Sequence, residues 1–137
     1  MTSKSTLLFC AAGVLKRDDL YLLAKRPEGK PFAGFWEFPG GKIQPPETPE
    51  EALARELHEE LGININTGSL QKITDVVYEY PDFKLSMPTF LCNVWEGEPQ
   101  ECEGQRLQWV TLQELPHYKT LPANIVIIQS LQKLFSK

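Results

Sequence analysis

The chain has 137 residues and a formal net charge of −4, from 14 Lys and Arg against 18 Asp and Glu. This length predicts a single domain spanning residues 1–137, because single cores usually run to about 100–200 residues. The charge argues against a general nucleic-acid coat, which needs a basic surface to displace counterions, so we expect no stable nucleic-acid binding. A small phosphorylated ligand is compatible with this charge if a metal ion or a local basic cluster neutralises it.

The cysteines and the apolar runs indicate the compartment. Cys10, Cys92 and Cys102 form no C-x-x-C pair and have no histidine at zinc-ligand spacing, so neither a disulfide framework nor a zinc site is predicted. Free thiols of this kind are typical of a cytoplasmic protein. Segment 1–6 lacks the apolar stretch of a signal peptide, and the longest apolar run, 7–15, is too short for a bilayer. We therefore expect a cytoplasmic protein without a membrane partner.

The first third of the chain predicts a hairpin and an ordered loop. Two apolar runs, 7–15 and 21–24, flank the polar segment Lys16–Asp19 and predict two strands joined by a turn. Segment 27–41 is dense in glycine, proline and aromatic residues. It predicts an ordered loop around a short strand at Trp36–Phe38.

A helix with complete boundary signals follows. Thr48 can act as N-cap, with Pro49 at the first helical position and Glu51 closing a capping box. Leu61 is the last periodic apolar residue. Gly62 can adopt the left-handed conformation that ends a helix.

The middle of the chain predicts further strands. Leu70–Glu79 and Lys84–Trp95 are strand-like and are joined by a turn, and Pro88 indicates an edge position or a bulge in the second strand. An acidic loop, Glu96–Glu103, leads to a strand at Leu107–Val110. Strands and helices are interspersed, so we expect an α/β fold with a mixed sheet and flanking helices.

The C-terminal part predicts helical structure. A short helical turn is expected near Thr111–Leu115, and a last helix can begin at Pro122. Apolar residues at helical spacing predict its buried side. They are Ile125, Ile128, Leu131, Leu134 and Phe135.

The segment from Gly41 to Ile63 carries acidic residues in a regular pattern, G-x5-E-x7-R-E-L-x-E-E-x-G-I. Positions i, i+3 and i+4 share one face of a helix, so Glu56, Glu59 and Glu60 are brought close together. Like charges at this spacing destabilise a helix by about a few tenths of a kcal/mol per pair, so a compensating cation is expected. Hard divalent cations such as Mg²⁺ prefer carboxylate oxygens.

A solvated acidic helix face is the alternative explanation of an E-x-x-E-E run. The neighbouring residues favour a metal site. Gly40 and Gly41 permit a tight backbone approach before the helix, and Glu47 can fold back onto the same site. Arg55 lies one turn before Glu59, where it can pair with carboxylates and orient them.

The pattern matches, position for position, the Nudix box G-x5-E-x7-R-E-U-x-E-E-x-G-U, in which U is aliphatic, so the chain resembles Nudix hydrolases. This resemblance implies an α/β/α sandwich that hydrolyses a nucleoside diphosphate linked to another moiety. It implies Mg²⁺ as the cofactor, with Mn²⁺ as an alternative. Carried onto this chain, it implies Glu56, Glu59 and Glu60 as metal ligands, together with the carbonyl group of Gly40.

Further segments resemble the MutT branch, whose pyrophosphohydrolases clear oxidised guanine nucleotides. They are Trp36–Ile43, Trp95–Pro99, Glu103–Gln105 and Pro122–Asn124, and they occur in MutT order. The implied reaction is hydrolysis of 8-oxo-dGTP to a monophosphate and pyrophosphate. It would protect DNA from oxidised precursors.

The MutT resemblance also implies roles outside the box. By this match Glu103 reaches the metal site, and Arg26 meets the phosphate or sugar of the nucleotide. Asn124 would hydrogen-bond the oxidised base, and Phe38 would present backbone groups to it. Each residue has a simpler alternative: Asn124 as the cap of the last helix, Glu103 as a solvated loop acid, Arg26 as a surface charge, and Phe38 as part of the core.

The expected catalytic set contains Glu56, Glu103, Arg55 and Glu47. Glu56 is the first choice to accept a proton from the attacking water, and Glu103 is the second.

Other residues lie outside these roles. Pro31 and Phe83 stand where the MutT pattern has polar or basic residues near the nucleotide. His58 and His117 lack partners at catalytic spacing and are expected at the surface.

Other functions stay open at this point. A pyrophosphohydrolase for CTP or another pyrimidine nucleotide would share the W-E-F-x-G-G-K start, although Asn124 favours a purine. A catalytically silent nucleotide-sensing module is the second alternative, and the intact box argues against it. A piece of a larger repair enzyme is the third, and it is not expected because no glycosylase segment precedes Met1. The expected state is a monomer that acts on a small nucleotide.

Overall fold

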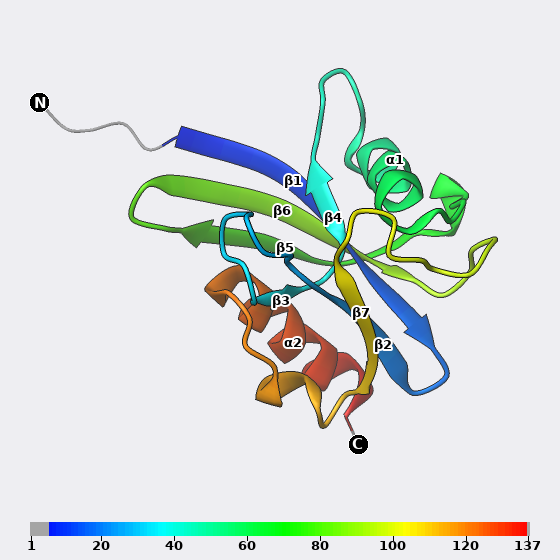
Figure 1. The fold of residues 1–137 in the computed structure, drawn as a ribbon. Coiled ribbons are helices and arrows are strands. Elements are labelled where there is room, and N and C mark those ends of the chain that lie inside the picture. The colour runs from blue at the N-terminus through cyan, green and yellow to red at the C-terminus, as the bar shows by residue number, and fades with distance from the viewer. Residues whose placement is uncertain (1–5, 137) are drawn as a thin grey trace, which may run out of the picture.

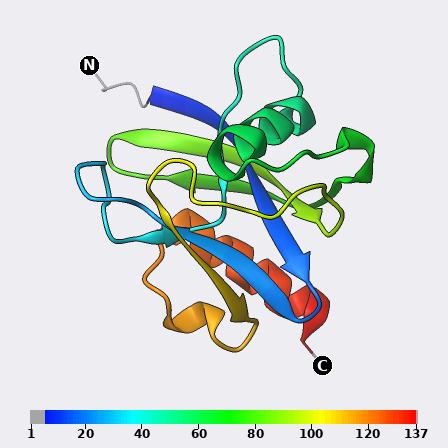
Figure 2. The same ribbon diagram turned by 45° about the vertical axis from the view of Figure 1, so that its right-hand side comes forward.

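The computed structural model describes residues 6–136, which hold one mixed β-sheet with an α helix on each side (Figures 1 and 2). Residues 1–5, which belong to the segment predicted to lack a signal peptide, lie outside this range. In chain order the elements are β1 (Thr6–Arg17), β2 (Leu20–Lys25), β3 (Trp36–Glu37), β4 (Gly40–Lys42), α1 (Pro49–Leu61), η1 (Thr67–Ser69), β5 (Gln71–Glu79), β6 (Phe83–Cys92), β7 (Arg106–Thr111), η2 (Leu115–His117) and α2 (Pro122–Phe135).

The sheet confirms the predicted mixed α/β architecture. Its strand order is β3-β2-β1-β6-β5, with β4 paired to β1 and β7 paired to β2. β1 and β6 are parallel, whereas the other pairs are antiparallel. The predicted hairpin is present, since Lys16 and Arg17 of β1 face Tyr21 and Leu20 of β2.

The two faces of the sheet carry separate cores, because successive side chains of a strand point to opposite faces. On β1, Ala12 and Val14 belong to the core that α2 covers, and Ala11 and Leu15 belong to the core under α1. Figure 2 shows the two helices on opposite sides of the sheet. Neither helix of the described residues has the length and apolarity needed to cross a membrane.

Helix α1 begins and ends as its sequence predicts. The hydroxyl of Thr48 accepts a hydrogen bond from the Glu51 N–H at 3.1 Å, and the Glu51 carboxylate accepts one from the Thr48 N–H at 2.9 Å. Gly62 ends the helix with a left-handed φ of 74°. The helix is positioned against the sheet by a fully buried stripe of Leu53, Leu57 and Leu61.

The edge alternative for Pro88 is wrong, because β6 lies between β1 and β5 inside the sheet. The β5–β6 register shifts on β5, between Lys72 and Thr74, so this bulge lies in the first of the two strands and not at Pro88, which pairs with Asp75. The β1–β6 pairing is interrupted opposite Pro88, between the pairs Phe9–Ser86 and Ala12–Thr89. Proline has no N–H for the ladder, so an interior strand must interrupt its pairing there. β6 also ends at Cys92 rather than Trp95.

The predicted buried side of α2 is partly wrong. Ile128 and Leu131 are buried, but Ile125 and Leu134 are exposed, and Ile127 takes a buried place instead. Residues 124, 127, 128 and 131 follow the i, i+3, i+4, i+7 spacing of one helix face, from which position 125 departs, whereas Leu134 lies on that face but in the last turn of the helix. The predicted helical turn lies later than expected, at η2, and His58 and His117 are exposed as predicted.

Candidate functional site

A cavity of about 460 Å³ lies against β1 and β4 and is closed by segments from across the chain. Six of the residues predicted to bind metal or substrate or to act in catalysis line it. They are Arg26, Phe38, Gly40, Glu60, Glu103 and Asn124. Arg55 and Glu56 adjoin this cavity from α1. The fold therefore brings residues nearly one hundred positions apart into one site.

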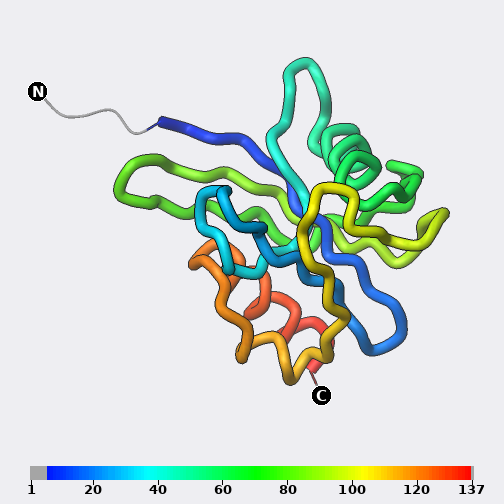
Figure 3. The backbone as a smooth tube through the Cα atoms, viewed as in Figure 1, coloured from blue at the N-terminus to red at the C-terminus, as the bar shows by residue number. Residues whose placement is uncertain are grey.

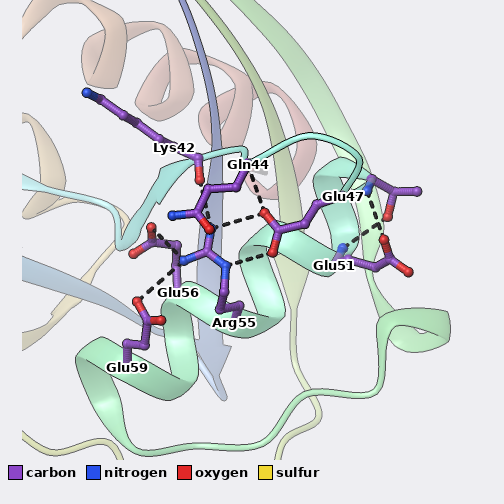
Figure 4. A network of polar contacts seen from close by, with 8 residues as sticks. Lys42, Gln44, Glu47, Glu51, Arg55, Glu56 and Glu59 are labelled. Atoms are coloured by element: carbon purple, nitrogen blue, oxygen red, sulfur yellow. Dashed lines mark hydrogen bonds and ion pairs between the residues drawn. The ribbon is translucent and has the colours of Figure 1, made fainter.

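Arg55 is the centre of a polar network beside the cavity (Figure 4). Its Nε and Nη2 donate to the two carboxylate oxygens of Glu47 at 2.7 and 3.1 Å, and Nη2 also donates to the Lys42 carbonyl at 2.9 Å. Nη1 donates to Glu56 at 3.3 Å and to Glu59 at 3.4 Å. The hydrogen bond from Arg55 lowers the pKa of Glu47, and the same bond raises the pKa of Arg55. This network fixes the loop before α1 to the helix.

Glu60 lies in a crowded acidic environment. Burial, a hydrogen bond with Glu56, and the negative charges of Glu56, Glu103 and Glu37 together raise the pKa of Glu60 to about 10. A carboxyl group in such surroundings takes up either a proton or a compensating cation. Glu60 therefore lies within electrostatic range of Glu56 and Glu103.

The two glycines before α1 allow this close approach. A Cβ atom on Gly41 would overlap the carboxyl group of Glu56, and a Cβ atom on Gly40 would overlap the carbonyl oxygen of Ala11. Any side chain at position 41 would displace Glu56 from its place beside the cavity. Both glycines are required by space, and Gly40 also by its φ of 155°, which other residues rarely adopt.

The donors at this site suit a hard divalent cation, because they are carboxylate and carbonyl oxygens. Within residues 6–136, no three acidic, histidine or cysteine side chains are already arranged around a common metal position. The Arg55 guanidinium group donates to both Glu56 and Glu59. The oxygen donors at this site thus have the chemistry to bind a cation.

Arg26 lies at the cavity beside an acidic residue, Glu37, to which the sequence assigned no role. Its Nη1 is 3.7 Å from the Glu37 carboxylate, and its Nε is buried without a hydrogen-bond partner in the described part of the chain. Burial raises the pKa of Glu37, and the charge of Arg26 opposes this rise. A free buried donor favours an acceptor from outside the chain.

Asn124 does not cap the last helix, so that alternative is wrong. The N-cap is Leu121, and Asn124 lies within the first turn, where it is only 7% exposed. Its Oδ1 accepts a hydrogen bond from the Phe38 N–H at 3.1 Å. Phe38 is itself buried, and its N–H is already used. Asn124 thus joins α2 to the segment before β4 at the cavity wall.

Aromatic side chains line another part of the cavity. The rings of Tyr80 and Phe83 are stacked, with centroids 4.8 Å apart and planes at 26°. The Tyr80 hydroxyl accepts a hydrogen bond from the Ala123 N–H at 3.0 Å. Phe83 therefore offers an apolar surface where the MutT pattern has a polar or basic residue, whereas Pro31 is exposed.

Gln105 and Tyr80 are cavity residues without a predicted role. Gln105 lies in the Glu103–Gln105 segment that resembles MutT, and that segment was the available signal for it. Tyr80 was assigned only to a turn, and no local pattern marks it. Glu37 likewise lay inside a matched segment without being singled out.

Comparisons with known proteins agree with this site. A family model described as NUDIX domain matches residues 10–130. The 8-oxo-dGTP diphosphatase of Haemophilus influenzae is 42% identical over 123 residues, which cover 88% of each protein. The CTP pyrophosphohydrolase of Escherichia coli is 34% identical over 123 residues, which cover 90% of each protein.

A solved structure shares the fold. It comes from a study of MutT from Aliivibrio salmonicida and Vibrio cholerae, is 31% identical, and superposes with a TM-score of 0.81 over 95% of this chain and all of that one. The α/β sandwich predicted from the sequence is thereby confirmed. With the family model matching most of its length, the chain belongs to the Nudix hydrolase family.

Proposed function

We propose that this chain is a metal-dependent nucleoside triphosphate pyrophosphohydrolase that converts 8-oxo-dGTP into 8-oxo-dGMP and pyrophosphate. The observation that carries this proposal is the single cavity in which box acid Glu60 and loop acid Glu103 lie together with Asn124. The relative from Haemophilus influenzae, named for 8-oxo-dGTP, supports the same substrate. We further propose that the protein acts as a cytoplasmic monomer on free nucleotides.

The proposed cofactor is Mg²⁺, with Mn²⁺ able to replace it. Its ligands would be the carboxylates of Glu56, Glu59, Glu60 and Glu103 and the carbonyl group of Gly40. When bound, such an ion neutralises phosphate charge and lowers the pKa of a coordinated water. The raised pKa of Glu60 supports this assignment, because burial and the neighbouring carboxylates disfavour a negative charge on Glu60 unless a cation is present.

Glu56 is the proposed proton acceptor for the attacking water. Its Oε2 is held by Arg55 at 3.3 Å, which fixes the direction of the carboxylate, and Glu47 holds Arg55 in turn. A carboxylate acts as a general base when it is positioned within hydrogen-bond reach of the proton that it takes up. Glu103, on the acidic loop, is the second candidate for this role.

The nucleotide would lie along the cavity. The buried free Nε of Arg26 and the side chains of Lys30 and Lys42 offer positive groups for phosphate oxygens. The base would lie against Phe83 and would meet the amide of Asn124. Since the Oδ1 of Asn124 is bonded to Phe38, its NH₂ group is the donor left for the base.

Two substitutions at one position test base recognition. Asn124→Asp keeps an oxygen acceptor for the Phe38 N–H but removes the NH₂ donors, whereas Asn124→Ala removes both. We expect both variants to lose the preference for 8-oxo-dGTP over dGTP, measured as the ratio of kcat/KM values, because a site that hydrogen-bonds its substrate discriminates through that bond. An unchanged ratio in Asn124→Asp would contradict the assigned role.

The CTP pyrophosphohydrolase relative favours a second candidate, a pyrimidine nucleotide as substrate. A smaller base would leave part of the apolar wall around Phe83 uncovered, and this favours the purine. A parallel assay with CTP distinguishes the two. Tight nucleotide binding without turnover in Mg²⁺ would instead indicate a sensing module.

A further inference from the structure

The acidic loop is attached to the C-terminal end of α1. In Figure 3 the loop, drawn in yellow, runs beside that helix. The last carbonyl groups of a helix have no partner within it. Here the Leu61 carbonyl accepts from the Gln100 N–H at 2.9 Å, and the Glu60 carbonyl accepts from the Cys102 N–H at 3.3 Å.

Gln105 adds a side chain to this attachment. Its Nε2 donates to the Glu60 carbonyl at 2.9 Å, and its Oε1 accepts from the Glu103 N–H at 2.9 Å. The side chain is almost fully buried, with 7% of its residue surface exposed. One planar amide group therefore sets the distance between the main chain of Glu60 and that of Glu103.

The backbone turn at Gly104 makes this geometry accessible. Gly104 has a φ of 76°, a left-handed conformation that disfavours other residues. The turn brings the Gln105 side chain back under the Glu103 N–H. Glu103 itself is exposed, and the other loop bonds described here reach Gln100 and Cys102, not Glu103.

The acidic surroundings explain why a neutral side chain, that of Gln105, makes this link. Glu103 is exposed on the acidic loop, and its main chain is linked to the end of α1 through the Gln105 amide. A neutral amide holds the two segments together without adding charge to the acidic group. A lysine or arginine at this place would compete with a metal ion for the same carboxylates.

We propose that Gln105 is a positioning residue that holds the Glu103 carboxylate beside that of Glu60, so that both reach one divalent cation. This inference rests on the proposed function in taking these two acids as metal ligands. It goes beyond that function by assigning the residue that aligns them.

Mn²⁺ binding to the nucleotide-free protein tests the proposal, with free Mn²⁺ measured by electron paramagnetic resonance. Gln105→Met removes both hydrogen bonds and keeps a similar shape. Gln108→Met is the matched control, because Gln108 is exposed on β7. We expect Gln105→Met to weaken Mn²⁺ binding by about ten- to a hundredfold, the usual loss for a residue that orients metal ligands. Weakening of less than about fivefold relative to Gln108→Met would overturn the proposal.

A double-mutant cycle separates positioning from a general structural effect. If Gln105 acts through Glu103, the effect of Gln105→Met on Mn²⁺ affinity is smaller in a Glu103→Gln background than in the wild-type chain. Equal effects in the two backgrounds would contradict the proposal. Amide hydrogen exchange supplies a second readout, since the Glu103 N–H should exchange faster in Gln105→Met than in Gln108→Met.

Gln105→Asn is the second variant if Gln105→Met does not fold. It is polar and neutral but one methylene shorter, so it cannot span from Glu103 to Glu60, and the same loss of Mn²⁺ affinity is expected. Wild-type affinity in a folded Gln105→Asn protein would overturn the proposal. These measurements use no nucleotide, so they test the role of Gln105 whether or not 8-oxo-dGTP is the substrate.

Discussion

Glu56 and Glu60 lie one turn apart on α1 and have different neighbours. Glu56 accepts a hydrogen bond from Arg55, whereas Glu60 is partly buried and lies near the carboxylates of Glu56, Glu103 and Glu37. The first arrangement directs a carboxylate, as a proton acceptor requires. The second creates a demand for positive charge, as a metal ligand requires.

At this scale, Glu56→Gln and Glu60→Gln should each lower kcat at saturating Mg²⁺ by on the order of a hundredfold or more. The amide keeps the size of the side chain but cannot accept the proton or supply an anionic ligand. Pyrophosphate release measures the loss. Glu50→Gln, in the first turn of α1 and away from the cavity, is the control that should retain turnover. Wild-type kcat in either test variant would show that these acids are wrongly assigned.

Single residues also show where prediction from the sequence ends. The acids of α1 are identified by spacing within one helix, so local sequence suffices for them. Gln105 meets Glu60 across 45 positions, and Asn124 meets Phe38 across 86. Such bonds depend on how the elements pack, and no local pattern contains that information.

Among the elements, α1 and α2 differ in how far their sequences predict them. The boundaries of α1 depend on caps within a few residues, and these are all present as predicted. Which face of α2 is buried depends on how the helix is rotated against the sheet. Apolar spacing alone predicted Ile125 as buried and left out Ile127, whereas Ile125 is exposed and Ile127 is buried. Pro88 shows the same limit, since strand order is set by distant pairing.

The corrected face of α2 gives a direct stability prediction. Ile127→Ala should lower the free energy of unfolding by about 2–5 kcal/mol, because it opens a cavity at a fully buried position. Ile125→Ala, at a position that is 44% exposed, should cost less than about 1 kcal/mol. Urea denaturation of the two variants measures the difference. Equal losses of unfolding free energy in the two variants would mean that α2 packs against the sheet with a different face.

Across the whole molecule, the negative charge is concentrated rather than spread. Six of the 18 acids lie between Glu47 and Glu60, and four lie between Glu96 and Glu103. Those two segments meet at the C-terminal end of α1, while Lys30 and Lys42 line the same cavity. The net charge of −4 therefore describes a local acidic site beside basic side chains that can receive phosphates.

This concentration predicts that divalent metal stabilises the whole fold. A ligand that binds only the folded state adds about 2.7 kcal/mol at a hundred times its Kd, so Mg²⁺ or Mn²⁺ should raise Tm in a concentration-dependent way. Differential scanning fluorimetry with and without EDTA measures this shift. Glu60→Gln should reduce the shift, and an equal shift in that variant would place the metal elsewhere.

The most direct test of the central claim compares the hydrolysis of 8-oxo-dGTP, dGTP and CTP in Mg²⁺, with every product identified. We predict the highest kcat/KM for 8-oxo-dGTP, with 8-oxo-dGMP and pyrophosphate as products, and no turnover in EDTA. A higher kcat/KM for CTP, release of orthophosphate in place of pyrophosphate, or binding without turnover would contradict it.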